Sequence, residues 1–286
     1  MQDIKSELAT QGYCVIPNVL TGDEVEQAKI MFKDWQKTIE NHDTIHKAID
    51  PHGIYKHHEV GHQRHAWYIR TNPKVQEAFK SIWNCDDLIV SFDGSCYIGE
   101  NNKQKDKIWT HTDQGPDNDI QCYQGFVALT SNVERTLIVY EGSHLYHKKY
   151  FEDKGIKSKS NWHLIDHDVL DNLMHTKRAL EVPAGSLVIW DSRSFHQNRY
   201  GAPESEERMV QYVCYFPRNH KNNTLATHKK RQKYFEERRT TSHWPAPVKV
   251  NGKQGNTYGN DSILIDYSKL KAPFLEDMTD EIQKLI

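Results

Sequence analysis

Two residues able to bind a metal lie close together in the segment "IWTHTDQGP". His111 and Asp113 are two positions apart, between an aromatic residue and a Gly-Pro turn. Because successive side chains on a β-strand alternate between its faces, both can point toward one ion. The chain has 17 histidines and a second pair of this kind, His57 and Glu59, so the spacing alone is not specific.

A third ligand must come from elsewhere in the chain, and His196 in "PAGSLVIWDSRSFHQN" is the best candidate. Two histidines and one carboxylate on one face of an octahedron leave three positions open, which suits Fe(II) and its reaction with O2. The same ligands also accept zinc, manganese, cobalt or nickel. Arg208, at the start of the next apolar run, can bind the carboxylate of an organic co-substrate through a bidentate pair; the alternative is a surface ion pair with Glu206 or Glu207.

The elements that would position these residues are mostly short strands. Five runs rich in Val, Ile, Tyr and Phe are separated by Gly, Asn, Asp and Pro; these are "DLIVSFDGSCYI", "CYQGFVALT", "TLIVYEGSH", "GSLVIWDS" and "RMVQYVCYF". Helical spacing of apolar residues predicts helices in "LTGDEVEQAKIMFKDWQKTIE" and "NPKVQEAFKSIW", ahead of the first run. Gly142-Ser143-His144 is interpreted as a turn, with His144 as a structural residue.

This pattern predicts a mainly β fold with flanking helices, whose core is a double-stranded β-helix of the jelly-roll, cupin-like type. At 286 residues the chain fits one domain, 1–286. We expect a largely helical N-terminal region at 1–86, the jelly-roll core at 87–217 with a helical insertion near 161–178, and a C-terminal extension at 218–286 packed on the core.

Composition limits the partners and the compartment. The net charge of −2 gives no overall attraction to nucleic acid or to an anionic membrane. No apolar run approaches a membrane span, and the N-terminus lacks a signal-peptide core. The five cysteines are odd in number, scattered and never arranged as C-x-x-C, so we expect reduced thiols and a cytoplasmic protein.

Five segments, taken in order, resemble one family. "GYCVIPNVLTGDEVEQAK", "WTHTD", "YEGSH", "VPAGSLVIWDSRSFHQN" and "RMVQYVCYF" are similar to the phytanoyl-CoA dioxygenase family of Fe(II)/2-oxoglutarate oxygenases, over roughly residues 11–217. The resemblance implies iron on His111, Asp113 and His196, and the 2-oxoglutarate C5 carboxylate on Arg208. It also implies O2 as co-substrate, release of succinate and CO2, and hydroxylation of an unactivated C–H bond.

Two further contacts to 2-oxoglutarate follow from the resemblance. Where many members carry Ser or Thr two residues after the distal histidine, this chain has Asn198, whose amide can donate the same hydrogen bond. Tyr97 is expected to supply the polar contact from the first core strand. Halogenating relatives replace the carboxylate ligand by a small residue, so the intact Asp113 favours hydroxylation.

The substrate is expected to be a small or lipid-derived molecule, although a protein side chain or a nucleic-acid base stays open. We expect Trp109, Gln114, Tyr68 and Arg70 to contact it, within or near the segments 57–70 and 114–121. The histidines of "HHEVGHQRH", residues 57–65, are interpreted as an exposed loop and lid rather than a second metal site. The alternative from another class is a non-catalytic jelly-roll binding protein that keeps the metal pocket.

Overall fold

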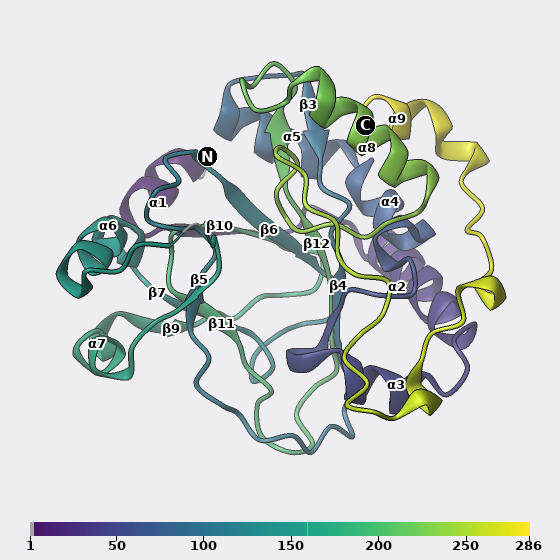
Figure 1. Ribbon diagram of the computed structural model, residues 1–286, viewed down its shortest axis with the longest axis horizontal. Coiled ribbons are helices and arrows are strands. Elements are labelled where there is room, and N and C mark those ends of the chain that lie inside the picture. The colour runs from purple at the N-terminus through teal and green to yellow at the C-terminus, as the bar shows by residue number, and fades with distance from the viewer. Residues whose placement is uncertain (1–2, 159) are drawn as a thin grey trace.

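The computed structural model describes residues 3–158 and 160–286 and consists of antiparallel sheets with flanking helices (Figure 1). The helices are α1 (Ile4–Thr10), α2 (Gly22–Lys37), α3 (His42–Ile49), α4 (Arg64–Arg70), α5 (Pro73–Trp83), α6 (Ser143–Lys154), α7 (His167–Asn172), α8 (Leu225–Glu236) and α9 (Thr279–Gln283). The strands are β1 (Tyr13–Ile16), β2 (Ile54–Tyr55), β3 (Leu88–Val90), β4 (Ser95–Ile98), β5 (His111–Thr112), β6 (Tyr123–Ala128), β7 (Leu137–Tyr140), β8 (His163–Leu164), β9 (Lys177–Ala179), β10 (Leu187–Asp191), β11 (His196–Asn198), β12 (Arg208–Val213) and β13 (Tyr215–Pro217).

Two of the sheets carry the core. The six-stranded sheet has the order β1-β10-β6-β12-β4-β2, and the five-stranded sheet has the order β8-β5-β11-β7-β9. Strands β4, β5, β6 and β7 alternate between the two sheets, and so do β9, β10, β11 and β12. Because of this alternation, residues far apart in sequence become neighbours, and His111 pairs with His196 across β5 and β11.

Local signals explain where the two long N-terminal helices begin. Helix α2 starts with a capping box in which Thr21 accepts from the backbone of Glu24, while the Glu24 carboxylate accepts from the backbone of Thr21. Asn72 caps α5, and Pro73 occupies its first turn, where its missing N–H costs nothing. Both helices therefore lie where the sequence predicts them.

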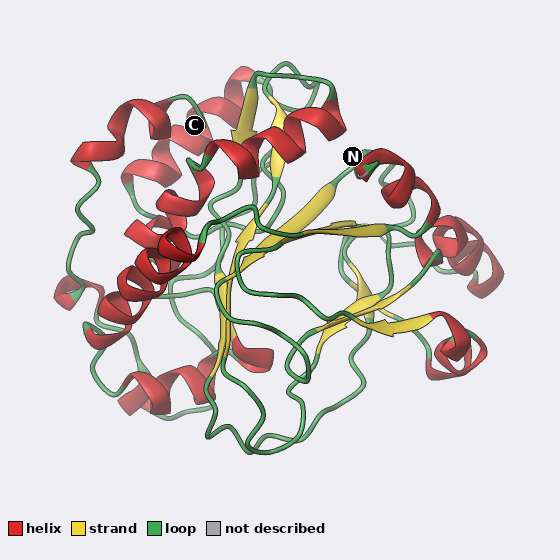
Figure 2. Ribbon diagram, turned by 180° about the vertical axis from the view of Figure 1, so that it is seen from behind, coloured by secondary structure: helices red, strands yellow, loops and turns green. Residues whose placement is uncertain are grey.

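The helices gather on two sides of the sheets. In Figure 2 one group, which includes α2, α4, α5 and α8, covers one side of the long sheet, while α1, α6 and α7 lie at the opposite end of the molecule. Successive side chains on a strand point to opposite faces of the sheet, so the apolar residues of one strand belong to two different cores. Val127 on β6 faces the helix-side core, whereas Phe126 and Ala128 face the core between the sheets.

Three local features differ in detail from the predictions. Gly142, at φ +74, is a turn residue and the N-cap of α6, and Ser143 and His144 belong to that helix; the polar sequence of α6 has little periodicity that could reveal it. The predicted helical insertion 161–178 is partly helical, because it holds α7 and a 3-10 turn at Met174–Thr176 as well as β8. His144 does have a structural contact, since its Nε2 lies 3.1 Å from the carbonyl oxygen of Ala9.

Residues 57–65 are the third. They do not form an exposed loop, because His57, His58, His62 and His65 are all buried, at the base of α4 and in the 3-10 turn Val60–His62. His62 Nε2 lies 3.1 Å from the carbonyl oxygen of Arg239, and His65 Nε2 lies 3.2 Å from Ser95 Oγ. These histidines serve as internal hydrogen-bonding groups. The length and polarity of the segment do not reveal that it is buried.

The C-terminal residues pack on the rest of the chain. Arg231 of α8 is fully buried and donates to the backbone carbonyls of Val90, Pro245 and Leu285. Ile282 and Leu285 belong to the same apolar cluster as α2 and α5. Across the described ranges, no helix has the length and apolar character that a membrane crossing requires.

Candidate metal centre and cavity

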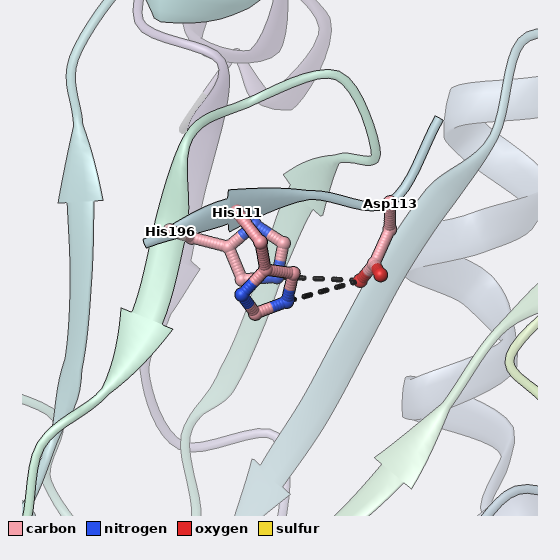
Figure 3. A group of neighbouring side chains, drawn as sticks. All are labelled: His111, Asp113 and His196. Atoms are coloured by element: carbon pink, nitrogen blue, oxygen red, sulfur yellow. Dashed lines mark ion pairs between the residues drawn. The ribbon is translucent and has the colours of Figure 1, made fainter. Parts of the chain in front are cut away.

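His111, Asp113 and His196 meet at the pairing of β5 with β11 (Figure 3). His111 is the first residue of β5, Asp113 follows its end, and His196 is the first residue of β11. Oδ2 of Asp113 lies 3.8 Å from His111 Nε2 and 3.4 Å from His196 Nε2. Within the part of the chain that the structure describes, this is the one group of three His, Cys, Asp or Glu side chains with ligand atoms all within 4.8 Å of one another.

Backbone contacts set the orientation of both imidazoles. His111 Nδ1 lies 3.1 Å from the carbonyl oxygen of Trp109, and His196 Nδ1 lies 2.9 Å from that of Ser194. A carbonyl oxygen only accepts hydrogen bonds, so each Nδ1 carries the proton and each Nε2 keeps its lone pair. Both Nε2 atoms are therefore in the form that binds a metal ion, with the second nitrogen fixed as in many metal sites.

Asp113 is held as a carboxylate. Gln124 Nε2 on β6 donates to its Oδ2 at 2.9 Å. Burial alone would raise the pKa of Asp113, but the nearby His111 and His243 rings lower it well below its usual value. Burial, with the neighbouring His196, lowers the pKa of His111. A neutral imidazole beside an ionised carboxylate is the donor set that a divalent cation needs, so these residues fit the expected iron.

Arg208 has the environment expected of an anion-binding residue. It is fully buried at the start of β12, its guanidinium carbon lies 5.4 Å from the centroid of Phe126, and its Nε donates to Asn132 Oδ1 at 3.3 Å. Its Nη2 has no hydrogen-bond partner, and no acid forms an ion pair with it within the described residues. The surface alternative fails, because Glu207 pairs with Lys33 and Glu206 accepts backbone N–H groups of Val133 and Arg135. A buried, unpaired cation is costly, so an anionic ligand is the group that this site lacks.

The two smaller contacts expected for 2-oxoglutarate have different positions. Asn198, on β11, borders the cavity and donates from Nδ2 to the Tyr212 hydroxyl at 3.0 Å. Tyr97 lies on the face of β4 that points to the helix-side core, where its ring centroid lies 6.2 Å from that of Phe32. Tyr97 is therefore not placed to contact a ligand in the cavity. Tyr212, four residues past Arg208 on the same face of β12, occupies the cavity wall instead.

A cavity of about 590 Å³ opens from the triad, within the range of roughly 300–1,000 Å³ typical of small-molecule sites. Its walls come from both sheets, from the loop before β8 and from the C-terminal region. The lining residues are Ile54, Lys56, Asp93, Trp109, His111, Asp113, Gln124, Leu137, Ser160, Asn161, Trp162, Trp190, His196, Asn198, Tyr212, Ser242, His243, Trp244, Pro247, Val248, Lys249 and Asn251. Asp93 is a second carboxyl in this wall, and burial raises its pKa to about 6.

Of the four residues expected to contact substrate, Trp109 borders the cavity and the other three do not. Arg70 is fully buried and donates to the backbone carbonyls of Gly61 and Asp93, and Tyr68 packs at the edge of the helix-side core. Gln114 is occupied by Ser192 and by the carbonyl of Asn118. No residue of the segments 57–70 or 114–121 lines the cavity, so both expected substrate segments are wrong.

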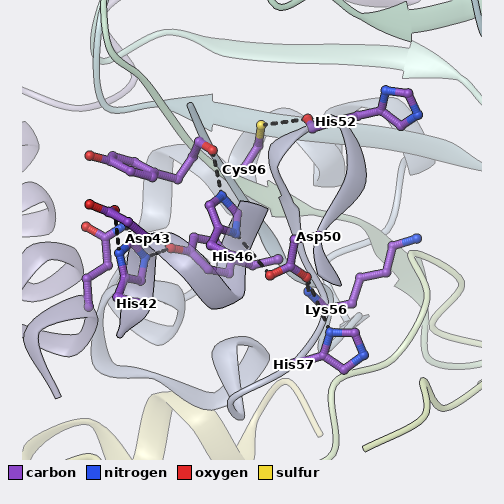
Figure 4. A network of polar contacts seen from close by, with 11 residues as sticks. His42, Asp43, His46, Asp50, His52, Lys56, His57 and Cys96 are labelled. Atoms are coloured by element: carbon purple, nitrogen blue, oxygen red, sulfur yellow. Dashed lines mark hydrogen bonds and ion pairs between the residues drawn. The ribbon is translucent and has the colours of Figure 1, made fainter. Parts of the chain in front are cut away.

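Figure 4 shows a polar network around Asp50 and His52, and Trp109 lies between this network and the metal centre. The ring centroid of Trp109 lies 4.7 Å from that of His111 and 3.6 Å from that of His52, which stacks on its other side. The turn that carries His52 follows Asp50, whose carboxylate lies 3.0 Å from His46 Nδ1 and 3.3 Å from His57 Nδ1. The network thus fixes the turn that supports Trp109 behind a metal ligand.

Seven of the lining residues missed from the sequence lie after residue 240. Ser242, His243 and Trp244 border the cavity although they belong to a segment without strand or helix periodicity. Tyr212 could have been found by applying the two-residue repeat of β12 to Arg208. Nothing in the local sequence around "SHWPAP" indicates that it returns to the centre of the molecule.

Comparisons with known proteins identify a family. A family model described as phytanoyl-CoA dioxygenase (PhyH) matches residues 8–199. The Ava biosynthesis cluster protein O of Aspergillus versicolor is 26% identical over 274 residues, which covers 85% of this chain and 86% of that protein.

Solved structures share the fold. A nickel complex of the non-heme monooxygenase ThoJ has a TM-score of 0.52 at 17% identity, covering 76% of this chain and 78% of that one. The epimerase SnoN, bound to Fe3+, alpha ketoglutarate and nogalamycin RO, also has a TM-score of 0.52, at 16% identity over 75% and 82%. EctD from S. alaskensis, with 2-oxoglutarate and 5-hydroxyectoine, gives 0.52 at 14% identity over 74% of each chain.

The class of protein defined by the family match and the site is that of the 2-oxoglutarate-dependent non-haem iron oxygenases. Within this class, the chain belongs to the phytanoyl-CoA dioxygenase family.

Proposed function

We propose that this protein hydroxylates a small molecule, with decarboxylation of 2-oxoglutarate to succinate and CO2. His111, Asp113 and His196 hold Fe(II), and Arg208 with Asn198 binds 2-oxoglutarate. The alternation of β4 to β7 and of β9 to β12 between two antiparallel sheets supports a double-stranded β-helix core.

One observation carries the proposal: the fully buried, unpaired Arg208 lies on the same strand and face as Tyr212, which lines the cavity together with the triad. Leu137, Asn198 and Tyr212 line the cavity together with the triad. Asn198 lies on β11 with His196 of the triad, and Tyr212 lies on β12 with Arg208. A ligand with a chelating end for the metal and a carboxylate for the guanidinium matches this arrangement, and 2-oxoglutarate is such a ligand.

The protein's own groups then have distinct tasks. Iron supplies the activation of O2 when it is bound. Gln124 orients the Asp113 carboxylate, and the carbonyls of Trp109 and Ser194 hold the two imidazoles. Arg208 fixes the far end of 2-oxoglutarate by a charge-assisted pair in a buried site, where such pairs are strong.

Hydroxylation is the reaction that we favour among those of the class. The carboxylate ligand Asp113 is present, so the position that halogenating relatives leave to chloride is filled. The solved structures with this fold include both a monooxygenase and an epimerase, and neither outcome is fixed by the fold itself.

A small-molecule substrate suits the size of the cavity. The Aspergillus relative is named for a biosynthesis cluster, and the solved structures SnoN and EctD hold nogalamycin RO and 5-hydroxyectoine, respectively. We further propose a cytoplasmic location, because all five cysteines are free thiols.

The test is an anaerobic titration of metal-free protein with Fe(II) and then 2-oxoglutarate, following the visible band of a 2-oxo acid chelated to Fe(II). We expect the band in the wild type, its loss in Asp113→Ala and a higher 2-oxoglutarate requirement in Arg208→Ala. Asp117→Ala, at an exposed aspartate outside the cavity, is the matched control and keeps the band. Folded wild-type protein that gives no band would exclude the proposal.

A further inference from the structure

The C-terminal hairpin, residues 241–250, forms one wall of the cavity. Its ends are joined by the bridge between Thr241 and Val250 and by the bond from Ser242 N to Lys249 O. Thr241 is fixed to the core, because its N–H donates to Phe92 O and its hydroxyl accepts from Phe92 N. Ser242, His243, Trp244, Pro247, Val248 and Lys249 all border the cavity.

Three consecutive residues of this hairpin have unsatisfied polar atoms. Ser242 Oγ, His243 Nε2 and Trp244 Nε1 are buried, and none has a hydrogen-bond partner within the described residues. Trp190, which also borders the cavity, has a buried indole N–H without a hydrogen-bond partner within the described residues. Native proteins rarely leave such groups unpaired, and an indole N–H can only donate. The unsatisfied set therefore calls for a ligand that brings hydrogen-bond acceptors.

The surrounding wall is unusually rich in flat side chains. Four of the seven tryptophans of the chain, Trp109, Trp162, Trp190 and Trp244, border the cavity with Tyr212, and of these Trp109 already stacks between His52 and His111. Indole and phenol faces favour stacked or edge-on contacts with other ring systems. A flexible acyl chain uses none of this geometry and loses its rotational freedom on binding.

We propose that the C-terminal hairpin is the substrate-recognition element, and that it selects a ring-containing small molecule with a carbonyl-type acceptor bound by His243 and Trp244. The inference rests on the proposed function, since it places the substrate beside the triad. It replaces the expected segments 57–70 and 114–121, which do not reach the cavity. The hairpin also lies outside residues 8–199, the part matched by the family model.

The experiment uses full-length protein loaded with Ni(II) and 2-oxoglutarate, since two histidines and a carboxylate accept nickel and the complex does not turn over. The probes are 2-quinolone, naphthalene as its flat analogue without an acceptor, and decanoate as an acyl chain, titrated by saturation-transfer NMR. We expect 2-quinolone to bind at least tenfold more tightly than naphthalene or decanoate. In His243→Phe and Trp244→Phe this preference over naphthalene falls at least fivefold, while naphthalene and 2-oxoglutarate bind as before. His175→Phe, at an exposed histidine, is the matched control and keeps the preference.

Hydrogen exchange locates the bound probe, and 2-quinolone should slow exchange in 241–250. Protection of 57–70 or 114–121 instead, equal binding of 2-quinolone and naphthalene, tighter binding of decanoate, or variants with wild-type preference would each overturn the inference. These failures are distinct from failure of the proposed function, in which the wild type does not bind 2-oxoglutarate at all. Retained naphthalene binding shows that a variant is folded with its cavity intact.

Discussion

Gln124 donates a 2.9 Å hydrogen bond from Nε2 to Oδ2 of Asp113, the oxygen that lies 3.4 Å from His196 Nε2. The amide thus fixes the carboxylate that faces the histidines. Replacing Gln124 by Leu removes this bond at similar volume, and we expect affinity for Fe(II) to fall about 10–100-fold, as for other residues that orient metal ligands. Competition with a chromophoric chelator measures it. Gln27→Leu, on the exposed face of α2, should leave the affinity unchanged; equal affinity in both variants would show that Gln124 does not support the site.

Arg208 gives a prediction in which binding and stability change differently. Its buried guanidinium has no acidic partner within the described residues, so Arg208→Met removes an uncompensated charge. We expect the Kd for 2-oxoglutarate to rise about 10–100-fold, which corresponds to a lost charged hydrogen bond of roughly 1.5–3 kcal/mol. The Tm of the ligand-free protein should stay equal or rise. Calorimetric titration and thermal unfolding check the two parts, and a variant that binds normally but melts early would make Arg208 structural.

The three side chains predicted as metal ligands do meet in the structure, because strand alternation and ordered motifs constrain their positions strongly. His111 and Asp113 share a face by the two-residue repeat, and the following strand order brings His196 to them. Tyr97 is assigned from the family resemblance alone, and its face of β4 belongs to the helix-side core. A shift of one residue on a strand reverses the face, so a single unsupported position is easily assigned to the wrong side.

The cavity wall could not be predicted in the same way. Trp244 and His243 reach the centre through a loop whose path depends on contacts far away in sequence, such as that of Thr241 with Phe92. The polar segment around His62 is buried because backbone carbonyls satisfy its side chains, and no local pattern encodes those partners. Tertiary contacts of this kind override what polarity suggests about exposure.

Two buried histidines predict acid sensitivity. Burial, with the nearby Arg70 cation, lowers the pKa of both His62 and His65 to about 3. An unfolded histidine binds its proton near pH 6.5, so the unfolded state binds more protons and stability falls as the pH drops from about 6.5 toward 3. Each histidine contributes a slope of about 1.4 kcal/mol per pH unit within this window.

His65→Phe tests this sign. The variant loses the contact with Ser95 Oγ and is expected to be less stable at pH 7, but its free energy of unfolding should fall less steeply between pH 6 and 4. Urea unfolding at several pH values measures the slope. His175→Phe serves as the exposed control and should retain the wild-type slope. A slope in His65→Phe equal to that of the wild type would contradict the assignment.

Arg231 connects helix α8 to the hairpin that forms one wall of the cavity. It donates to the carbonyl of Pro245, within the C-terminal hairpin, and to those of Val90 and Leu285 in the core. Arg231→Met leaves these buried carbonyls without their donor, and we expect the free energy of unfolding to fall by about 2–4 kcal/mol. Exchange of the backbone amides of 241–250 should become faster than in the rest of the chain, because local stability of this wall depends on the bond to Pro245. Lys230→Met, on the exposed side of α8, is the matched control.

Binding of Fe(II) and 2-oxoglutarate should persist in both variants, since the residues that bind them lie on or next to β5, β11 and β12. Loss of metal binding in Arg231→Met would mean that the hairpin supports the triad as well as the cavity wall.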